Sequence, residues 1–184
     1  MSFSQDTMFT PEDFVDRFNY DLANDLGNLL NRTIGMMNKY FEGTIPTNII
    51  ERTDFDDDLE NYTKEQISKV EEQMDTYHVS NALAEIWALI GRTNKYIDET
   101  APWTLSKSEE GTEKLKSVMN HLAENLRKIA ILLVPFMPQT SEKMLAQLGI
   151  SKETATWDSM NSNNEIPENT KVISKGEPLF VRLD

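Results

Sequence analysis

Cysteine is absent from this chain, and glycine and proline occur only seven times each in 184 residues. Without cysteine the chain cannot form a disulfide framework or use thiol chemistry. Its longest purely apolar run, residues 129–134, has six residues, whereas a membrane-spanning helix needs about 20. The N-terminus shows no basic region followed by an apolar stretch, so no secretory signal is indicated. We therefore expect a cytoplasmic protein without a membrane segment.

Motifs for catalysis are also missing. The sequence has no Gly-rich phosphate loop and no Gly-x-Ser-x-Gly elbow. Its two histidines, His78 and His121, cannot supply the two Glu-x-x-His segments of a dinuclear carboxylate bundle. Acidic residues between 54 and 65 match several ligand positions of a calcium loop, but Leu59 stands where the sharp turn requires glycine. We interpret this stretch as a solvated acidic loop and expect no catalytic residue and no metal site.

Basic residues are scarce, with 18 lysines and arginines against 31 acidic residues and a net charge of -13. Because phosphate groups are bound by lysine and arginine, this balance counts against a nucleic-acid partner. The acids are concentrated, however, in two clusters within residues 54–60 and 71–75. A neutral or basic local face can still bind a nucleic-acid loop, with weak non-specific affinity.

Apolar residues recur at helical spacing in several long stretches, and no extended alternation with a period of two is present. After an irregular leader over residues 1–9, a helix is expected from Thr10 to about Phe41, because Thr10 can cap it and Pro11 suits its first position. A loop over about 43–62 follows. The further helices are expected over 63–100, with a break near 77–80, then over 112–134, and over 139–148.

These stretches and their short connections predict an all-α fold, an antiparallel bundle of four to five helices. The bundle occupies residues 1–150. The remaining residues, 151–184, are rich in Asn, Ser, Thr and Pro and are expected to form a mostly irregular C-terminal tail. Of the tryptophans, Trp87 lies on an apolar stripe and is expected in the core, while Trp157 is expected to hold the tail in place.

Polar side chains mark one face of the first expected helix. With about 100° per residue, Asn28 and Arg32 lie one turn apart on the side away from the core. The second expected helical stretch ends at Pro102 and Trp103. An amide, a guanidinium group and an aromatic ring are the groups that hold single-stranded bases. The residues alone leave open a solvated polar face at Asn28 and Arg32, and a packed position for Trp103.

Several longer stretches together resemble the anticodon-binding domain of methionyl-tRNA synthetase, in its bacterial form. The resemblance is strongest in residues 20–32, 38–41, 94–103 and 133–138, which follow one another at the spacing of that family. It covers about residues 9–149, with a weaker match in the last ten residues. There, Val181 stands at a position where the family has proline.

The resemblance implies a function as well as a fold. In that family this domain reads the methionine anticodon CAU, the tryptophan matching Trp103 stacks on the first anticodon base, and the residues matching Asn28 and Arg32 bind bases. Pro102 would orient the ring, and Asn94 would be a neighbouring contact. The implied partners are methionine tRNA and the catalytic domain of the same parent chain, toward which the tail would pack.

ATP and magnesium would belong to that catalytic domain, whose signature motifs do not occur here, so no cofactor is expected in this chain. Two alternatives stay open at this stage. One is the anticodon-binding domain of a related class I synthetase for cysteine, valine, leucine or isoleucine. The other is a helical interaction bundle with no role in RNA binding.

Overall fold

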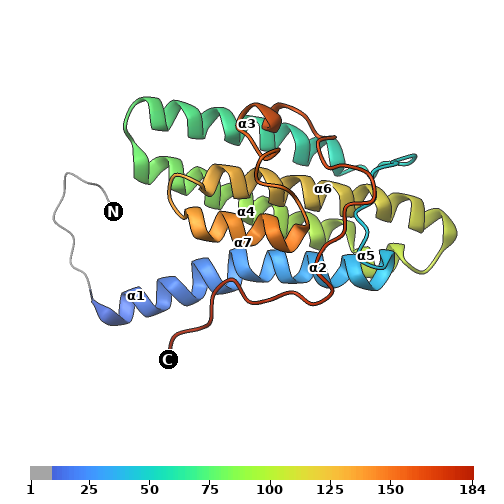
Figure 1. Ribbon diagram of the computed structural model, residues 1–184, viewed down its shortest axis with the longest axis horizontal. Coiled ribbons are helices and arrows are strands. Elements are labelled where there is room, and N and C mark those ends of the chain that lie inside the picture. Colours follow the sequence, from blue (N-terminus) through green and yellow to red (C-terminus); the bar gives the residue numbers. More distant parts are fainter. Residues whose placement is uncertain (1–9) are drawn as a thin grey trace.

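The structure, a computed structural model, describes residues 10–184, which form a bundle of helices crossed by a long C-terminal tail (Figure 1). The expected leader over residues 1–9 lies outside the described residues. The predicted all-α class is confirmed. The elements are α1 (Pro11–Arg17), the π-helical segment η1 (Phe18–Gly27), α2 (Asn28–Phe41), α3 (Asp56–Asp75), α4 (Val79–Thr100), α5 (Pro102–Leu105), α6 (Glu109–Leu133), α7 (Pro138–Leu148) and the 3-10 turn η2 (Asp158–Asn161).

Elements α1, η1 and α2 form one continuous rod (Figure 1). Thr10 begins it as predicted, because its hydroxyl accepts a hydrogen bond of 3.1 Å from the Asp13 backbone amide. The rod ends at Phe41, where Glu42 and Gly43 take left-handed conformations with φ of 51° and 79°. Helix α6 lies in the middle of the bundle, and every residue from 117 to 133 is buried. The core is therefore built around α6.

The predicted loop over 43–62 was wrong in its second half, because α3 begins at Asp56. Carboxylates in the first turn of a helix are stabilised by its dipole. Asp56 is also fully buried and accepts hydrogen bonds from the Tyr96 hydroxyl at 2.7 Å and the Ser117 hydroxyl at 2.5 Å. Burial opposes ionisation of Asp56, but these bonds and those from Thr53 outweigh it and hold its pKa below the usual value. Asp56 thus ties α3 to α4 and α6 and is not a solvated loop residue.

Helix boundaries elsewhere follow the predictions within a few residues. The expected break near 77–80 separates α3 from α4, with Tyr77 at a φ of 61°. Helix α6 begins at Glu109, three residues before the predicted start at Thr112, because the Ser108 hydroxyl caps it at the Gly111 amide. Helix α7 ends at Gly149, whose φ is 71°.

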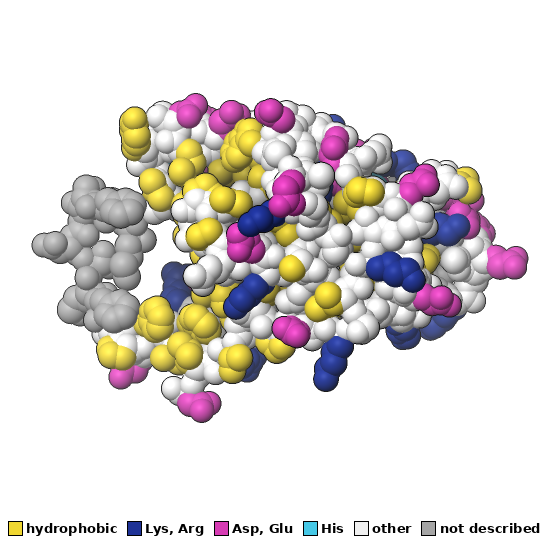
Figure 2. Space-filling view, viewed as in Figure 1, with side chains coloured by type: hydrophobic (Ala, Val, Ile, Leu, Met, Phe, Trp, Pro, Cys, Tyr) yellow, Lys and Arg dark blue, Asp and Glu magenta, His cyan; other side chains and the backbone are white. Residues whose placement is uncertain are grey.

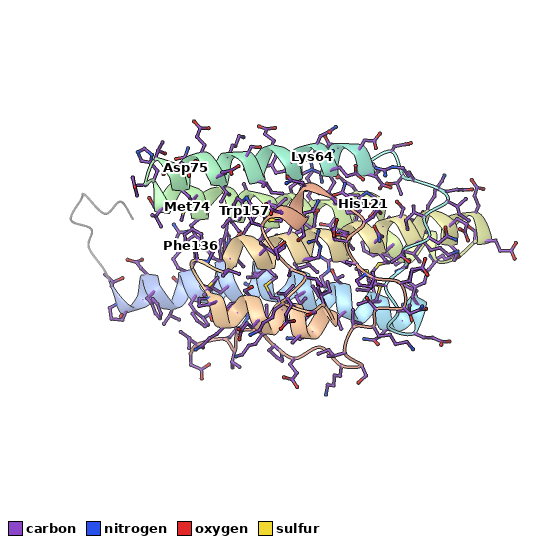
Figure 3. The ribbon with its side chains drawn as sticks, turned by 45° about the horizontal axis from the view of Figure 1, so that its top comes forward. Lys64, Met74, Asp75, His121, Phe136 and Trp157 are labelled. Carbon is purple, nitrogen blue, oxygen red and sulfur yellow. The ribbon has the colours of Figure 1, made fainter. Side chains whose placement is uncertain are left out.

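The tail runs back over the bundle and contains only the short turn η2, as its composition predicted. Buried charges on α6 hold it. The Arg127 guanidinium donates a hydrogen bond of 2.8 Å to the Ser159 hydroxyl, and the Glu124 carboxylate accepts one of 3.1 Å from the Ile166 backbone amide. Trp157 lies over α3 beside Lys64 with 39% of its surface exposed (Figure 3). The tail is therefore fixed by hydrogen bonds to the centre of the bundle.

The end of the tail reaches the rod. The Asn19 side chain donates to the Leu183 carbonyl and accepts from the Leu183 amide, both at 2.9 Å, and the ring of Phe180 meets that of Phe18 edge-on at 5.8 Å. The last residues are thereby aligned with η1, far in sequence but adjacent in space (Figure 1).

Candidate nucleic-acid interface

The end of α4 is shaped so that one tryptophan projects from the bundle. Ala101 has a φ of 43° and ends α4 in a left-handed conformation, which is uncommon for a residue other than glycine. Pro102 then starts α5 and is buried, and its fixed backbone angle restricts the chain on either side. Trp103 follows with 45% of its surface exposed. The ring is therefore partly packed, and one part of it remains accessible.

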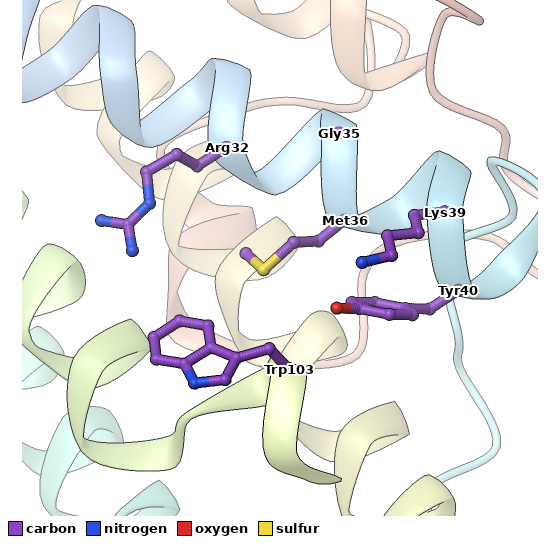
Figure 4. A pocket seen from close by; sticks show the side chains of 6 residues that line it. All are labelled: Arg32, Gly35, Met36, Lys39, Tyr40 and Trp103. Atoms are coloured by element: carbon purple, nitrogen blue, oxygen red, sulfur yellow. The ribbon is translucent and has the colours of Figure 1, made fainter. Parts of the chain in front are cut away.

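Trp103 forms one wall of a hollow of about 370 Å³, and side chains of α2 form the other (Figure 4). Arg32 lies above the indole ring, while Met36 lies between Trp103 and Tyr40. The lining residues are Arg32, Gly35, Met36, Lys39, Tyr40 and Trp103. The hollow thus combines two aromatic rings, a thioether and two cations.

The two cations of the hollow differ in their partners. The Arg32 guanidinium donates to the Asp98 carboxylate of α4 at 3.3 Å, a contact that orients its planar group. The Lys39 ammonium lies 5.0 Å from the centre of the Tyr40 ring. Among residues 10–184, Lys39 makes no ion pair. Acidic side chains gather along the edge formed by α3 (Figure 2), and no residue of α3 lines the hollow.

The residues singled out from the sequence occupy three kinds of position. Arg32 and Trp103 meet in the hollow, and Pro102 lies buried directly before the ring. Asn28 is exposed one turn before Arg32 on α2, outside the lining of the hollow. Asn94 donates its amide to the Asp25 carbonyl at 3.3 Å. The residues predicted for the site therefore lie in one region of the bundle, but only Arg32 and Trp103 line the same cavity.

Met36 and Tyr40 were missed by reasoning from single side-chain types. They follow Arg32 at intervals of four, so the same helical face carries all three. Thioether and aromatic groups look like core residues in a sequence, and the pattern alone gave no reason to place them at a surface hollow. The spacing from Arg32 was the available signal.

The segment η1 precedes the polar face of Asn28 and Arg32, which lies within α2. Its hydrogen bonds run from i to i+5, so about 100° per residue does not hold through it. Trp87 donates from its indole nitrogen to the Asp21 carbonyl at 3.2 Å and is only partly buried, at the edge of the core. The expected core position of Trp87 is corrected accordingly. Asn24 accepts a hydrogen bond from Arg182 and belongs to the contact with the tail.

A family model described as the anticodon binding domain of methionyl tRNA ligase matches residues 46–183. The chain belongs to this family. A second model, for class I tRNA synthetases of the methionine type, matches residues 1–34. The resemblance inferred from the sequence is thereby confirmed, and the methionine family is favoured over those for cysteine, valine, leucine and isoleucine.

Relatives and solved structures agree with this assignment to the methionyl-tRNA ligase family. The methionine–tRNA ligases of Listeria innocua and Bacillus subtilis are 55% and 53% identical to the chain over 183 residues. The apo structure of Mycobacterium tuberculosis methionyl-tRNA synthetase superposes with a TM-score of 0.91 at 30% identity, over 100% of this chain and 37% of that one. The structure of the same enzyme with bound methionyl-adenylate gives a TM-score of 0.90 over 98% of this chain and 35% of that one.

The chain spans only part of these relatives. It is covered to 99% by the Listeria innocua ligase but accounts for 28% of that protein's length.

Over residues 10–184, no group of three or more histidine and acidic side chains is placed to hold a metal ion. No helix in this same part is long and apolar enough to cross a membrane.

Proposed function

We propose that this domain of the methionyl-tRNA ligase family reads the CAU anticodon of methionine tRNA at the hollow between α2 and Trp103. The first anticodon base, a cytosine, stacks on the exposed part of the Trp103 ring. The Arg32 guanidinium and the Asn28 amide hydrogen-bond the base edges. The observation that carries this proposal is a tryptophan, 45% exposed, placed opposite Arg32 in one cavity.

The physical basis of the proposal is the combination of a stacking surface with hydrogen-bond donors beside it. A base stacked on an aromatic ring gains about 1–3 kcal/mol, largely without regard to its identity. Selectivity must therefore come from hydrogen bonds to the base edge. The Asp98 carboxylate holds the Arg32 guanidinium in place, and Asn28 lies one turn away on the same helix. An oriented guanidinium and an exposed amide one turn apart suit the recognition of neighbouring bases.

Pro102 and Asn94 have supporting roles in this proposal. Pro102 is buried and fixes the chain direction before the ring. Asn94 fastens α4 to the Asp25 carbonyl, three residues before Asn28. Asn94 therefore holds Asn28 at a set distance from the end of α4, the end that leads to Trp103.

The remaining part of the parent protein would supply the chemistry. We propose that a catalytic domain in the same chain, with ATP and magnesium, attaches methionine to the tRNA in the cytoplasm. The chain's small share of its relatives' length and the class I match over residues 1–34 support a domain on that side. The tail, residues 151–184, ends against η1 within this matched region, which supports its packing toward the catalytic domain.

Binding of methionine tRNA with a CAU anticodon tests the proposal when it is compared with the same tRNA carrying a changed first base. We expect the unchanged tRNA to bind at least about tenfold more tightly, a difference of about 1.4 kcal/mol. Filter binding at low salt suits an acidic domain with few phosphate contacts. Equal affinity for both tRNAs contradicts the methionine assignment, and no binding of either contradicts an RNA-binding function.

A further inference from the structure

No feature of the folded protein requires glycine at position 35. It lies in the second half of α2 and is exposed, and its φ is not in the left-handed region where only Gly43 and Gly149 are found among the described glycines. A Cβ atom built on Gly35 would meet no heavy atom within 4 Å beyond its own helical turn. Glycine within a helix destabilises it relative to alanine. Neither backbone conformation nor internal packing requires it here.

The position of Gly35 supplies a reason outside the protein. It lies on α2 between Arg32 and Lys39 and lines the same hollow as Trp103 (Figure 4). The bare backbone there forms the part of the α2 wall that carries no side chain. A flat ligand lying on the Trp103 ring can approach the helix closely only at such a place, as glycines allow wherever a ligand approaches a backbone.

We propose that Gly35 is a contact residue of the nucleotide that stacks on Trp103, and that its missing side chain lets the sugar or base edge of that nucleotide lie against α2. This inference rests on the function proposed above. It assigns to Gly35 a steric role: a methyl group at this position occupies the space that the nucleotide needs, although the free protein has room for it.

Gly91 provides a matched control. It too is exposed within a helix, α4, and a Cβ atom built on it would also meet nothing within 4 Å. It does not line the hollow. Replacing either glycine by alanine removes the same conformational freedom from the unfolded chain. G35A and G91A should therefore raise the melting temperature alike, by about 1–4 °C.

Binding separates the two variants. The probe is a 15N-labelled chain titrated with an RNA hairpin carrying the CAU anticodon loop, followed by NMR so that weak affinities are measured. We expect G35A to bind about tenfold more weakly than the unaltered chain, since overpacking a close contact by one methyl group has an effect of this size. G35L should abolish binding, and G91A should bind as the unaltered chain does.

The outcomes distinguish this inference from the proposed function. If the unaltered chain prefers the CAU hairpin and G35A binds it equally well, the role of Gly35 is refuted and the proposed function stands. Equal loss of affinity in G35A and G91A also refutes it, because the effect would not belong to the hollow. If the unaltered chain shows no preference for CAU, the proposed function itself fails.

Discussion

Replacing Trp103 by alanine should separate RNA binding from folding. The ring is 45% exposed, so the substitution removes little more than half of the packing of a buried tryptophan. Full burial would make the loss about 3–5 kcal/mol, and partial burial reduces it to about 2–3 kcal/mol, or roughly 4–12 °C in melting temperature. Loss of a stacking surface removes about 1–3 kcal/mol of binding energy, which weakens the affinity roughly 5- to 150-fold.

Fluorescence anisotropy of a labelled CAU hairpin measures the affinity, and thermal unfolding followed by circular dichroism measures the stability. W157A is the matched control, because Trp157 is 39% exposed and lies over α3 away from the hollow. It should lose comparable stability and no affinity. W103F should keep part of the affinity, since a smaller ring still stacks. A fall in melting temperature above about 12 °C with unchanged affinity in W103A would refute the stacking role and make the ring a packing residue.

Three further substitutions test the electrostatics of the domain. K39Q should reduce the salt dependence of hairpin binding by about 0.7 in the slope of log K against log salt. The reason is that Lys39 is a cation of the hollow without an ion pair among the described residues. An unchanged slope would show that the RNA phosphates do not contact Lys39. D56N should lower the free energy of unfolding by about 2–4 kcal/mol at pH 7, since a buried network loses its charge. The pKa of Asp56 is lowered by folding, so the stability that its carboxylate contributes is full above about pH 4 and is lost as pH falls through the folded pKa. Urea unfolding should therefore show a smaller difference in stability between D56N and the unaltered chain at pH 3 than at pH 7. A difference that stays constant would contradict this. Burial lowers the pKa of Lys128 to about 8 from 10.5, so the unfolded chain binds more protons than the folded chain between these pH values. The stability of the unaltered chain should therefore rise with pH across this window relative to that of K128M. Parallel pH profiles of stability in the two chains would show that Lys128 does not titrate there.

The helices and their order could be predicted because their apolar residues keep a clear period over several turns. The start of α3 could not, because its inward face carries the polar residues Asp56, Thr63 and Gln66. Burial of Asp56 depends on partners from α4 and α6, Tyr96 and Ser117. Those partners are distant in sequence, so the acidic stretch resembled a solvated loop.

The candidate site was predicted in its types of residue and only partly in its geometry. Exposure of Asn28 followed from the helical period of α2, and the outward direction of Trp103 did not, since it depends on the left-handed Ala101. The role of Asn94 could not be derived either. Its partner is the Asp25 carbonyl in η1, and a π-helical segment leaves no mark in the apolar period that would reveal it.

Contact between the Trp103 ring and the first anticodon base can be observed by intermolecular nuclear Overhauser effects. The sample is the 15N,13C-labelled chain with a hairpin carrying the CAU loop. Stacking predicts cross-peaks between the indole protons of Trp103 and the H5 and H6 protons of the first cytosine, with upfield shifts of those cytosine protons. Hairpin contacts that map elsewhere on the bundle, with the Trp103 signals unmoved, would contradict recognition of the anticodon at this hollow.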